Sequence, residues 1–340
     1  MEKVRWGILS TGYIANLFAE GLSVLDDATL VAVGSRSQDS ADAFGAKWNA
    51  PHRHASYEAL ANDPDVEVIY IGTPHPFHYE NALTCLNAGK HALIEKPFTM
   101  NARQARALID LAHKKGLFLM EAMWTRYLPA MVQVRKWIAD GEIGEVELVR
   151  AHFSFMTNFN PKSRLFAPEL GGGALLDAGV YPISFAHMVL GTPKTISSTA
   201  TLGKTGTDDR SAYLFGYEGG KTALLSSGVQ LAIPVEADIF GTKGYIKVHE
   251  PWLNPRVVTL AKPSAPGGDS MLIYDGILFD KQTVHPMARG NGYNYEAAEV
   301  GQCIRAGKRE SAIMSQAETL SIMETMDKIR AQWNLTYPNE

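Results

Sequence analysis

Short apolar runs alternate with helical patterns through the first 122 residues of the chain. One helix is marked at both ends, because Asn101 is a good N-cap and Gly116 a good C-terminal stop. Strands separated by helices are typical of βαβ units, so we predict a doubly wound α/β domain with a parallel sheet. The expected strands cover residues 4–9, 29–34, 66–71, 91–94 and 117–120.

The pattern changes in the second part of the chain. Strand-like runs at residues 146–156 and 222–229 belong to a region with few helical patterns, which predicts a mostly antiparallel sheet in an α+β domain. Residues 261–269 are rich in Pro and Gly and are expected to form a surface loop. The chain closes with a predicted helix that begins at Ser315, where Ser315 and Glu318 form a capping box.

Length, charge and cysteine content limit the class of protein. A chain of 340 residues exceeds one ordinary core, so we expect two domains, residues 1–122 and 123–340. The net charge of -4 gives no basic surface for nucleic acid or anionic membrane, and no apolar run of about 18 residues predicts a membrane span. The two cysteines, Cys85 and Cys303, predict neither a disulfide nor a metal site. With no signal-peptide pattern at the N-terminus, the expected location is the cytoplasm.

A nucleotide-binding fingerprint follows the first predicted strand. Ser10 stands at its first glycine position, Gly12 at the second and Ala15 at the third. Without a side chain at Gly12, the backbone can approach a pyrophosphate, which free N–H groups and the helix dipole then stabilise. A tight turn without a ligand is the alternative, but the position in a βαβ series favours the dinucleotide. The loop residues assigned to the cofactor are Ser10, Thr11, Gly12, Tyr13 and Ile14.

The end of the second predicted strand indicates which nicotinamide cofactor binds. NAD-specific sites usually place an Asp or Glu there, whereas this chain has Ser35, Arg36 and Ser37, with no acid before Asp39. Arg36 can pair with a 2′-phosphate or stack on adenine, and the two serines can donate hydroxyl groups. A solvated arginine that opens a helix is the alternative. We predict NADP.

The loop after the third predicted strand lies at the carboxyl edge of the sheet, where ligands of such sheets bind. It contains Thr73, Pro74, His75 and His78. The two histidines are expected to touch the cofactor or the substrate. A histidine that only caps the next helix is the alternative.

Three side chains further along carry candidate chemistry. Lys96 follows the fourth predicted strand, and near a nicotinamide it can bond the reacting oxygen and lower the pKa of a neighbouring acid. Asp177 and Tyr181 stand four residues apart, so a helix would carry both on one face. Pro182 cannot donate to the carbonyl of Ala178, so this helix should kink or loosen, and a kink that turns Tyr181 away would remove it from the site.

These motifs together resemble the Gfo/Idh/MocA oxidoreductase family over nearly the whole chain. The resemblance rests on the Glu-Lys-Pro triplet with Lys96 and on a later Asp-x-Gly-x-[His/Tyr] pattern with Asp177 and Tyr181. It implies a Rossmann domain, an open-faced antiparallel domain that usually forms a homodimer, and catalytic roles for Lys96 and Tyr181. By the same resemblance, Asp177 orients the substrate or supports Lys96.

Tyr181 and residues 119–126 make the chain most similar to the branch with dimeric dihydrodiol dehydrogenase and NADP-dependent D-xylose 1-dehydrogenase. This implies oxidation of an aldopyranose, such as D-xylose to the lactone, or of a vicinal dihydrodiol. Tyr181, with its pKa lowered by Lys96, would take the hydroxyl proton. The remaining residues assigned to the cofactor are Glu95, Lys96, Trp124 and Arg126, and those assigned to the substrate are Trp124, Phe153, Asp177, Tyr181 and Trp252.

Three alternatives stay open. The aromatic residues assigned to the substrate could each be plain core. The same site could serve an NADPH-dependent reductase of a sugar-derived carbonyl, as in the anhydrofructose reductases of this family. The protein could also be a cofactor sensor without catalysis, as a fungal galactose-pathway repressor of the family is.

Overall fold

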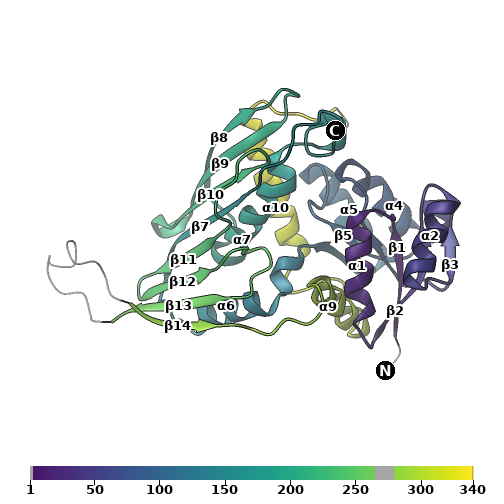
Figure 1. The fold of residues 1–340 in the computed structure, drawn as a ribbon, viewed down its shortest axis with the longest axis horizontal. Helices are drawn as coiled ribbons and strands as arrows, with labels where there is room; N and C mark the ends of the chain where they lie inside the picture. Colours follow the sequence, from purple (N-terminus) through teal and green to yellow (C-terminus); the bar gives the residue numbers. More distant parts are fainter. Residues whose placement is uncertain (1–2, 265–278, 339) are drawn as a thin grey trace.

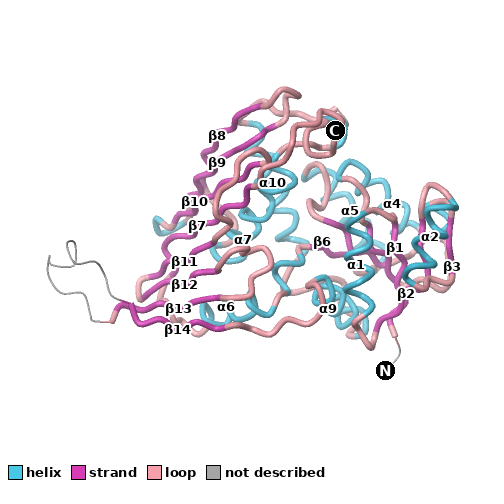
Figure 2. Tube along the Cα trace, viewed as in Figure 1, coloured by secondary structure: helices cyan, strands magenta, loops and turns pink. Residues whose placement is uncertain are grey.

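Two β-sheets with helices between them build the molecule (Figure 1). The structure is a computed structural model that describes residues 3–264, 279–338 and 340. Figure 2 shows one sheet at each end of the molecule. One is entirely parallel and the other is mostly antiparallel, which confirms the predicted fold class.

The parallel sheet has six strands in the order β3-β2-β1-β4-β5-β6. Its centre consists of apolar runs with buried side chains on both faces, as expected where helices cover both sides. The edge strand β3 was missed, because its three residues, His-Arg-His, contain no apolar run. The strands are β1 (Val4–Leu9), β2 (Ala28–Gly34), β3 (His52–His54), β4 (Val68–Ile71), β5 (His91–Glu95) and β6 (Leu119–Ala122).

Local sequence signals explain the helices around this sheet. Before α5, the Asn101 side chain accepts a hydrogen bond from the backbone N–H of Gln104, and Gly116 ends the helix at a φ of 70°. Both ends of this predicted helix are therefore confirmed. The helices are α1 (Tyr13–Ser23), α2 (Gln38–Trp48), α3 (Tyr57–Ala61), α4 (His78–Asn87) and α5 (Ala102–Lys115), with a 3₁₀ turn η1 (His75–Phe77).

The second sheet has the order β14-β13-β12-β11-β7-β10-β9-β8, and its one parallel pair is β7 with β10. The loop predicted at 261–269 is wrong at its start, since residues 261–263 pair with β14 as part of β13. Residues 265–269 lie outside the described residues. The strands are β7 (Val146–Ser154), β8 (Thr195–Leu202), β9 (Asp208–Gly216), β10 (Thr222–Gly228), β11 (Ala237–Gly241), β12 (Gly244–Val248), β13 (Val258–Pro263) and β14 (Phe279–Val284).

Helices cover one face of this second sheet, and the other face is open (Figure 1). The covering helices include α6 (Pro129–Ala139) and α7 (Val180–Leu190), which pack on β13 and β7. Burial alternates along β9 and β10, so Tyr213 and Leu225 are buried while Leu214 and Leu224 are exposed. A connection after β6 contains the 3₁₀ turn η2 (Trp124–Tyr127).

The last two helices return to the parallel sheet. Helix α9 (Tyr293–Arg305) packs on α1, and α10 (Gln316–Ala331) packs on both α5 and α7. The Ser315 side chain caps α10 by accepting from the N–H of Glu318, as predicted. The reciprocal half of the capping box was a wrong expectation, because the Glu318 carboxylate pairs with Arg126 at 2.8 Å.

One described stretch, Pro168–Leu190, is long and apolar enough to resemble a membrane span. Of its most apolar window, 83% is buried inside the protein, which is the behaviour of a core helix. This stretch includes α7 and the turns that precede it, and it supplies one wall of the cleft described next.

Candidate active site

A cleft of about 380 Å³ lies at the carboxyl edge of the parallel sheet and is closed on its other side by the turn before α7. This volume is within the range of pockets that hold small ligands. The cleft brings together residues that the sequence spreads over several motifs. It is lined by Ser10, Gly12, Tyr13, Ile14, Gly72, Thr73, Pro74, His75, Glu95, Lys96, Arg164, Leu170, Asp177 and Tyr181.

The fingerprint loop has the geometry of a phosphate-binding turn. Ser10 adopts a φ of 112°, a conformation that favours glycine, at the position where the fingerprint has its first glycine. Gly12, the N-cap of α1, has an ordinary φ of -74°, and an added Cβ would meet only the Ser10 hydroxyl, at 3.5 Å. Neither the backbone nor the packing of the described residues requires glycine there. The start of α1 therefore leaves open space in which a ligand could approach the backbone.

The residues predicted to bind a 2′-phosphate lie together at the end of β2. Arg36 is exposed, and Ser35 is held in place by its backbone N–H, which donates to the carbonyl of His54 at 3.0 Å. The Ser37 hydroxyl caps α2 through the N–H of Ser40. An exposed guanidinium beside a helix start suits a phosphate, so these residues fit NADP.

Lys96 and Asp177 form a buried ion pair across the cleft. The Lys96 Nζ donates to the Asp177 side chain at 3.2 Å and to its backbone carbonyl at 2.9 Å. Burial opposes the charge on Lys96, but the negative charge of Asp177 raises the lysine pKa above its usual value. Burial would likewise raise the pKa of Asp177, but Lys96 and Arg164 hold it well below the usual range. Both side chains are therefore charged at neutral pH.

Tyr181 points into the same cleft. Its hydroxyl accepts a hydrogen bond from the indole N–H of Trp124 at 3.0 Å, and the Lys96 Nζ lies 4.8 Å from the centre of its ring. The predicted direction of its pKa is wrong, because burial raises the pKa of Tyr181 more strongly than the Lys96 charge lowers it. Tyr181 is therefore protonated at neutral pH.

The proline after Tyr181 does not turn this side chain away. The chain forms a π-helical turn, η4 (Leu175–Gly179), directly before α7. Pro182 has no N–H to donate to the carbonyl of Ala178, and the wider turn lies directly before the helix that contains this proline. The helix loosens as expected, but Asp177 and Tyr181 both keep their places in the wall of the cleft.

Arg164 was missed by the sequence analysis. It belongs to the segment between β7 and the 3₁₀ turn η3 (Pro168–Leu170), and its guanidinium donates to the Asp177 carboxylate at 2.7 Å. Its side chain is 54% exposed, so it closes the cleft toward solvent. An arginine in an irregular segment far from the recognised motifs gives no pattern that could have identified it.

Two other predicted residues line the cleft as buried groups. The ring of His75 lies 3.8 Å from Asp177, and burial lowers the pKa of His75 to about 3, so it is neutral. Glu95 accepts a hydrogen bond from the Tyr70 hydroxyl at 2.5 Å, and burial raises the pKa of Glu95 to about 7.

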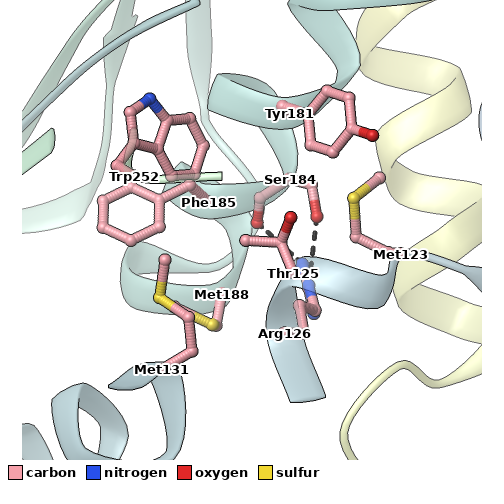
Figure 3. A pocket seen from close by; sticks show the side chains of 9 residues that line it. All are labelled: Met123, Thr125, Arg126, Met131, Tyr181, Ser184, Phe185, Met188 and Trp252. Carbon is pink, nitrogen blue, oxygen red and sulfur yellow. Dashed lines mark hydrogen bonds between the residues drawn. The ribbon is translucent and has the colours of Figure 1, made fainter. Parts of the chain in front are cut away.

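Several predicted residues have structural contacts instead of a place in the cleft. Both ring nitrogens of His78 face backbone carbonyls, at 2.9 Å and 2.8 Å. Arg126 is buried against Ser184 and the carbonyl of Ile313, and Trp252 packs beside Phe185 (Figure 3). Arg126 and Trp252 line a small void of about 10 Å³ that Tyr181 also lines, and neither of them is among the residues that line the cleft.

Trp124 and Phe153 both contact Tyr181. Trp124 donates a hydrogen bond to the Tyr181 hydroxyl and stacks on Tyr293, with the ring centres 4.8 Å apart. Phe153 meets the Tyr181 ring edge-on at 5.4 Å. Neither lines the cleft, so both support Tyr181 from outside it.

A parallel sheet of this order, with a glycine-containing turn and a charged cleft at its carboxyl edge, is typical of a Rossmann domain. Residues 4–123 match the oxidoreductase family with an NAD-binding Rossmann fold, and residues 131–247 match the GFO/IDH/MocA C-terminal domain. The chain belongs to the Gfo/Idh/MocA oxidoreductase family.

Curated relatives cover nearly the whole chain. Trans-1,2-dihydrobenzene-1,2-diol dehydrogenase of Xenopus laevis is 39% identical, over 98% of this chain and 99% of that protein. The Mus musculus protein of the same name is 35% identical, over 99% of each. The protein is therefore an enzyme of the dehydrogenase type.

Solved structures agree with this fold. A 3-ketoreductase from Actinomadura kijaniata, in complex with NADP and TDP-benzene, is 25% identical with a TM-score of 0.81, over 97% of this chain and 98% of that chain. An aldose-aldose oxidoreductase from Caulobacter crescentus, with glycerol, has a TM-score of 0.84 at 20% identity, over 97% of each chain.

Proposed function

We propose that the protein is an NADP-dependent dehydrogenase that oxidises a hydroxyl group of a vicinal dihydrodiol or of an aldopyranose, such as D-xylose, to the lactone. The observation that carries this proposal is the convergence of Lys96, Asp177 and Tyr181 beside the fingerprint loop. The dihydrodiol dehydrogenase name of the curated relatives supports the diol, and the aldopyranose rests on the motif resemblance.

The cofactor site follows from the loops at the carboxyl edge. The start of α1, with Ser10 to Ile14, would hold the pyrophosphate, and Ser35 to Ser37 the 2′-phosphate. Thr73, Pro74, His75 and Glu95 line the cleft toward its reacting end. A bound nicotinamide supplies the hydride acceptor.

Lys96, Asp177 and Tyr181 have different roles in the proposed reaction. Lys96 donates a hydrogen bond to the substrate oxygen, and Asp177 keeps Lys96 charged and oriented through their ion pair. Tyr181 exchanges the hydroxyl proton. In oxidation Tyr181 must first lose its own proton, and the Lys96 charge 4.8 Å from its ring stabilises the resulting phenolate.

One observation favours a second candidate, an NADPH-dependent reductase of a sugar-derived carbonyl. The pKa values of Lys96 and Tyr181 are both raised, the first by the charge of Asp177 against burial and the second by burial. Two protonated donors beside the reacting oxygen suit the protonation of a carbonyl during reduction. Both directions use the same side chains.

The remaining proposals concern the whole protein. We assign cofactor binding to residues 1–122, and substrate binding and dimerisation to residues 123–340, with the open sheet face as the homodimer contact. Exposed leucines such as Leu214 and Leu224 support an interface there. A small-molecule substrate and a cytoplasmic location complete the proposal, while the alternative of a cofactor sensor remains a possible result of the assay.

The experiment follows NADPH formation with NADP and a panel of trans-dihydrobenzenediol, D-xylose and D-glucose, and repeats the panel with NAD. We expect turnover with NADP, and Arg36→Ala should raise the KM for NADP by about 10-fold or more while the KM for NAD changes little. Turnover with NAD alone would contradict the role of Arg36. Tight NADPH binding with no turnover in either direction would favour the sensor.

A further inference from the structure

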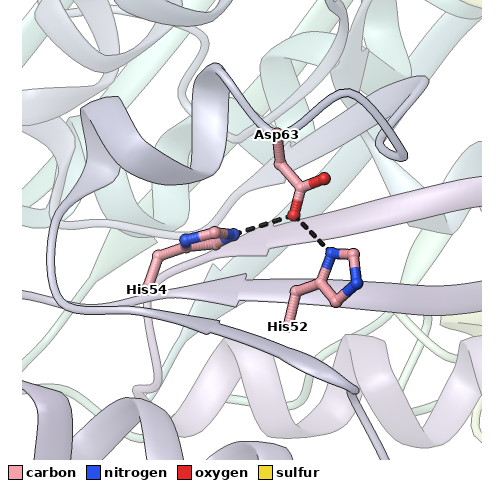
Figure 4. A group of neighbouring side chains, drawn as sticks. All are labelled: His52, His54 and Asp63. Atoms are coloured by element: carbon pink, nitrogen blue, oxygen red, sulfur yellow. Dashed lines mark hydrogen bonds and ion pairs between the residues drawn. The ribbon is translucent and has the colours of Figure 1, made fainter.

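Two histidines and an aspartate meet at the edge of the parallel sheet (Figure 4). His52 and His54 lie on β3, and the His-x-His spacing on a strand places both rings on the same face. Asp63 reaches them from the turn after α3. None of the three lines the cleft, so the proposed function does not use them.

The donor atoms of these three residues converge on one point. Asp63 Oδ2 lies 2.7 Å from His52 Nδ1 and 2.8 Å from His54 Nε2. The two rings are inclined by 82°, so they approach this point from different directions. The three ligand atoms lie within 4.8 Å of one another.

We propose that His52, His54 and Asp63 bind a divalent transition-metal ion, with zinc the best match. Two imidazole nitrogens and one carboxylate oxygen form a common zinc donor set, which water completes to a tetrahedron. The cysteine count led the sequence analysis to expect no metal site, but this donor set contains no cysteine.

The histidine rings have to move away from Asp63 Oδ2 to accept the ion. Zinc bonds of about 2.0–2.1 Å place tetrahedral ligand atoms about 3.3 Å apart, which is wider than the two contacts to Asp63 Oδ2 and within the 4.8 Å span of the three ligand atoms. The side chains of His52 and His54 are 39% and 25% exposed, so they have room to move, whereas that of Asp63 is 2% exposed and fixed.

Asp65 supplies the outer contacts that orient such a site. Its carboxylate lies 3.8 Å from His52 Nε2, the ring nitrogen that would not bind the metal. Its backbone N–H donates to the other oxygen of Asp63 at 2.9 Å. A carboxylate behind a metal-binding histidine fixes the ring and strengthens the ligand.

The bound ion would connect two elements at the edge of the proposed cofactor domain. It would join β3 to the turn after α3, and the carbonyl of His54 accepts the N–H of Ser35 in the proposed 2′-phosphate loop. A ligand that binds only the folded state raises its stability. Zinc should therefore raise the melting temperature of the protein, whether or not the proposed function is correct.

The test uses untagged full-length protein, stripped with chelator and titrated with Co²⁺ by absorption spectroscopy and with Zn²⁺ by calorimetry. We expect one ion per chain, with the intense visible bands of tetrahedral Co²⁺. His54→Ala and His52→Gln should each weaken binding about 100-fold, and Asp65→Asn about 10-fold. His113→Ala, which changes an exposed histidine on α5, is the matched control and should bind as the wild type.

Circular dichroism verifies that each variant is folded, and thermal unfolding with and without Zn²⁺ provides a second readout. The wild type and His113→Ala should melt higher with Zn²⁺, and His52→Gln should not. Absence of saturable binding by the wild type would overturn the proposal. Equal metal affinity in His52→Gln and His113→Ala would also overturn it. The contacts would then be explained by hydrogen bonds from the two histidine N–H groups to the Asp63 carboxylate.

Discussion

The chemistry at residue scale depends on how burial and charge compete in the cleft. Lys96 keeps its charge in a buried place because Asp177 lies 3.2 Å away, whereas Tyr181 stays neutral because burial raises its pKa more than the Lys96 charge lowers it. Motifs located these three residues from the sequence. The sequence could not show that burial outweighs Lys96 at Tyr181, nor that Arg164 joins Asp177, because both effects depend on tertiary contacts.

The raised pKa of Tyr181 has a direct consequence for pH dependence. Oxidation needs the phenolate, so its rate should rise with pH and not level off below about pH 10, whereas reduction should stay constant through neutral pH and fall at alkaline pH. Tyr181→Phe should lower kcat by about 10²- to 10⁴-fold and remove this alkaline dependence. Rate profiles of both directions measure it. An unchanged profile in the Phe variant would assign the proton to another group.

At the scale of elements, the sequence was most informative where a cap or an apolar stripe was present. Asn101 and Gly116 located both ends of α5, and the apolar runs located five strands of the parallel sheet. The short polar strand β3 lacked such a signal. The contact of Glu318 with Arg126 was also unpredictable, since it joins α10 to η2 across a long sequence separation.

Arg126 provides a prediction at this scale, because its contacts join η2 to α7 and α10. Arg126→Met removes its bonds to Ser184, Ile313 and Glu318, and should lower the free energy of unfolding by about 3 kcal/mol. Affinity for NADPH should stay within about twofold at a temperature where the variant is folded. Denaturant unfolding and fluorescence titration measure the two effects.

Arg103→Met is the control, since this arginine is exposed on α5. It should change neither quantity. A variant of Arg126 that unfolds like the wild type but loses NADPH affinity would contradict this structural role and support the cofactor role predicted from the sequence.

At the scale of the whole molecule, the carboxyl edge of the parallel sheet and the turn before α7 enclose one charged cleft, and one face of the second sheet stays open (Figure 1). Strand-like runs in a region with few helical patterns predicted the second sheet, and the family resemblance implied its open face. The burial of the covered face depends on tertiary packing of α6, α7 and α10, which local patterns do not show. The helices α9 and α10 lie far along the chain yet pack on the first domain, which local patterns do not indicate.

The open face yields a prediction on assembly. If it forms the homodimer contact, Leu224→Asp should convert a particle of two chains into single chains, because the charge would be buried against the partner. Val132→Asp is a suitable control, since Val132 is exposed on α6 instead. Sedimentation equilibrium gives the masses. Wild-type protein that sediments as one chain would contradict the proposed dimer.

The most direct measurement of the proposed chemistry is a single turnover by wild-type protein and Lys96→Met, with NADPH binding measured on the same samples. We predict that Lys96→Met binds NADPH within about threefold of the wild type but transfers hydride at least about 10³-fold more slowly. The reason is that the cleft loses its charged donor to the reacting oxygen while the fingerprint loop stays intact. Hydride transfer at the wild-type rate in Lys96→Met would contradict the assignment of Lys96 and, with it, the proposed active site.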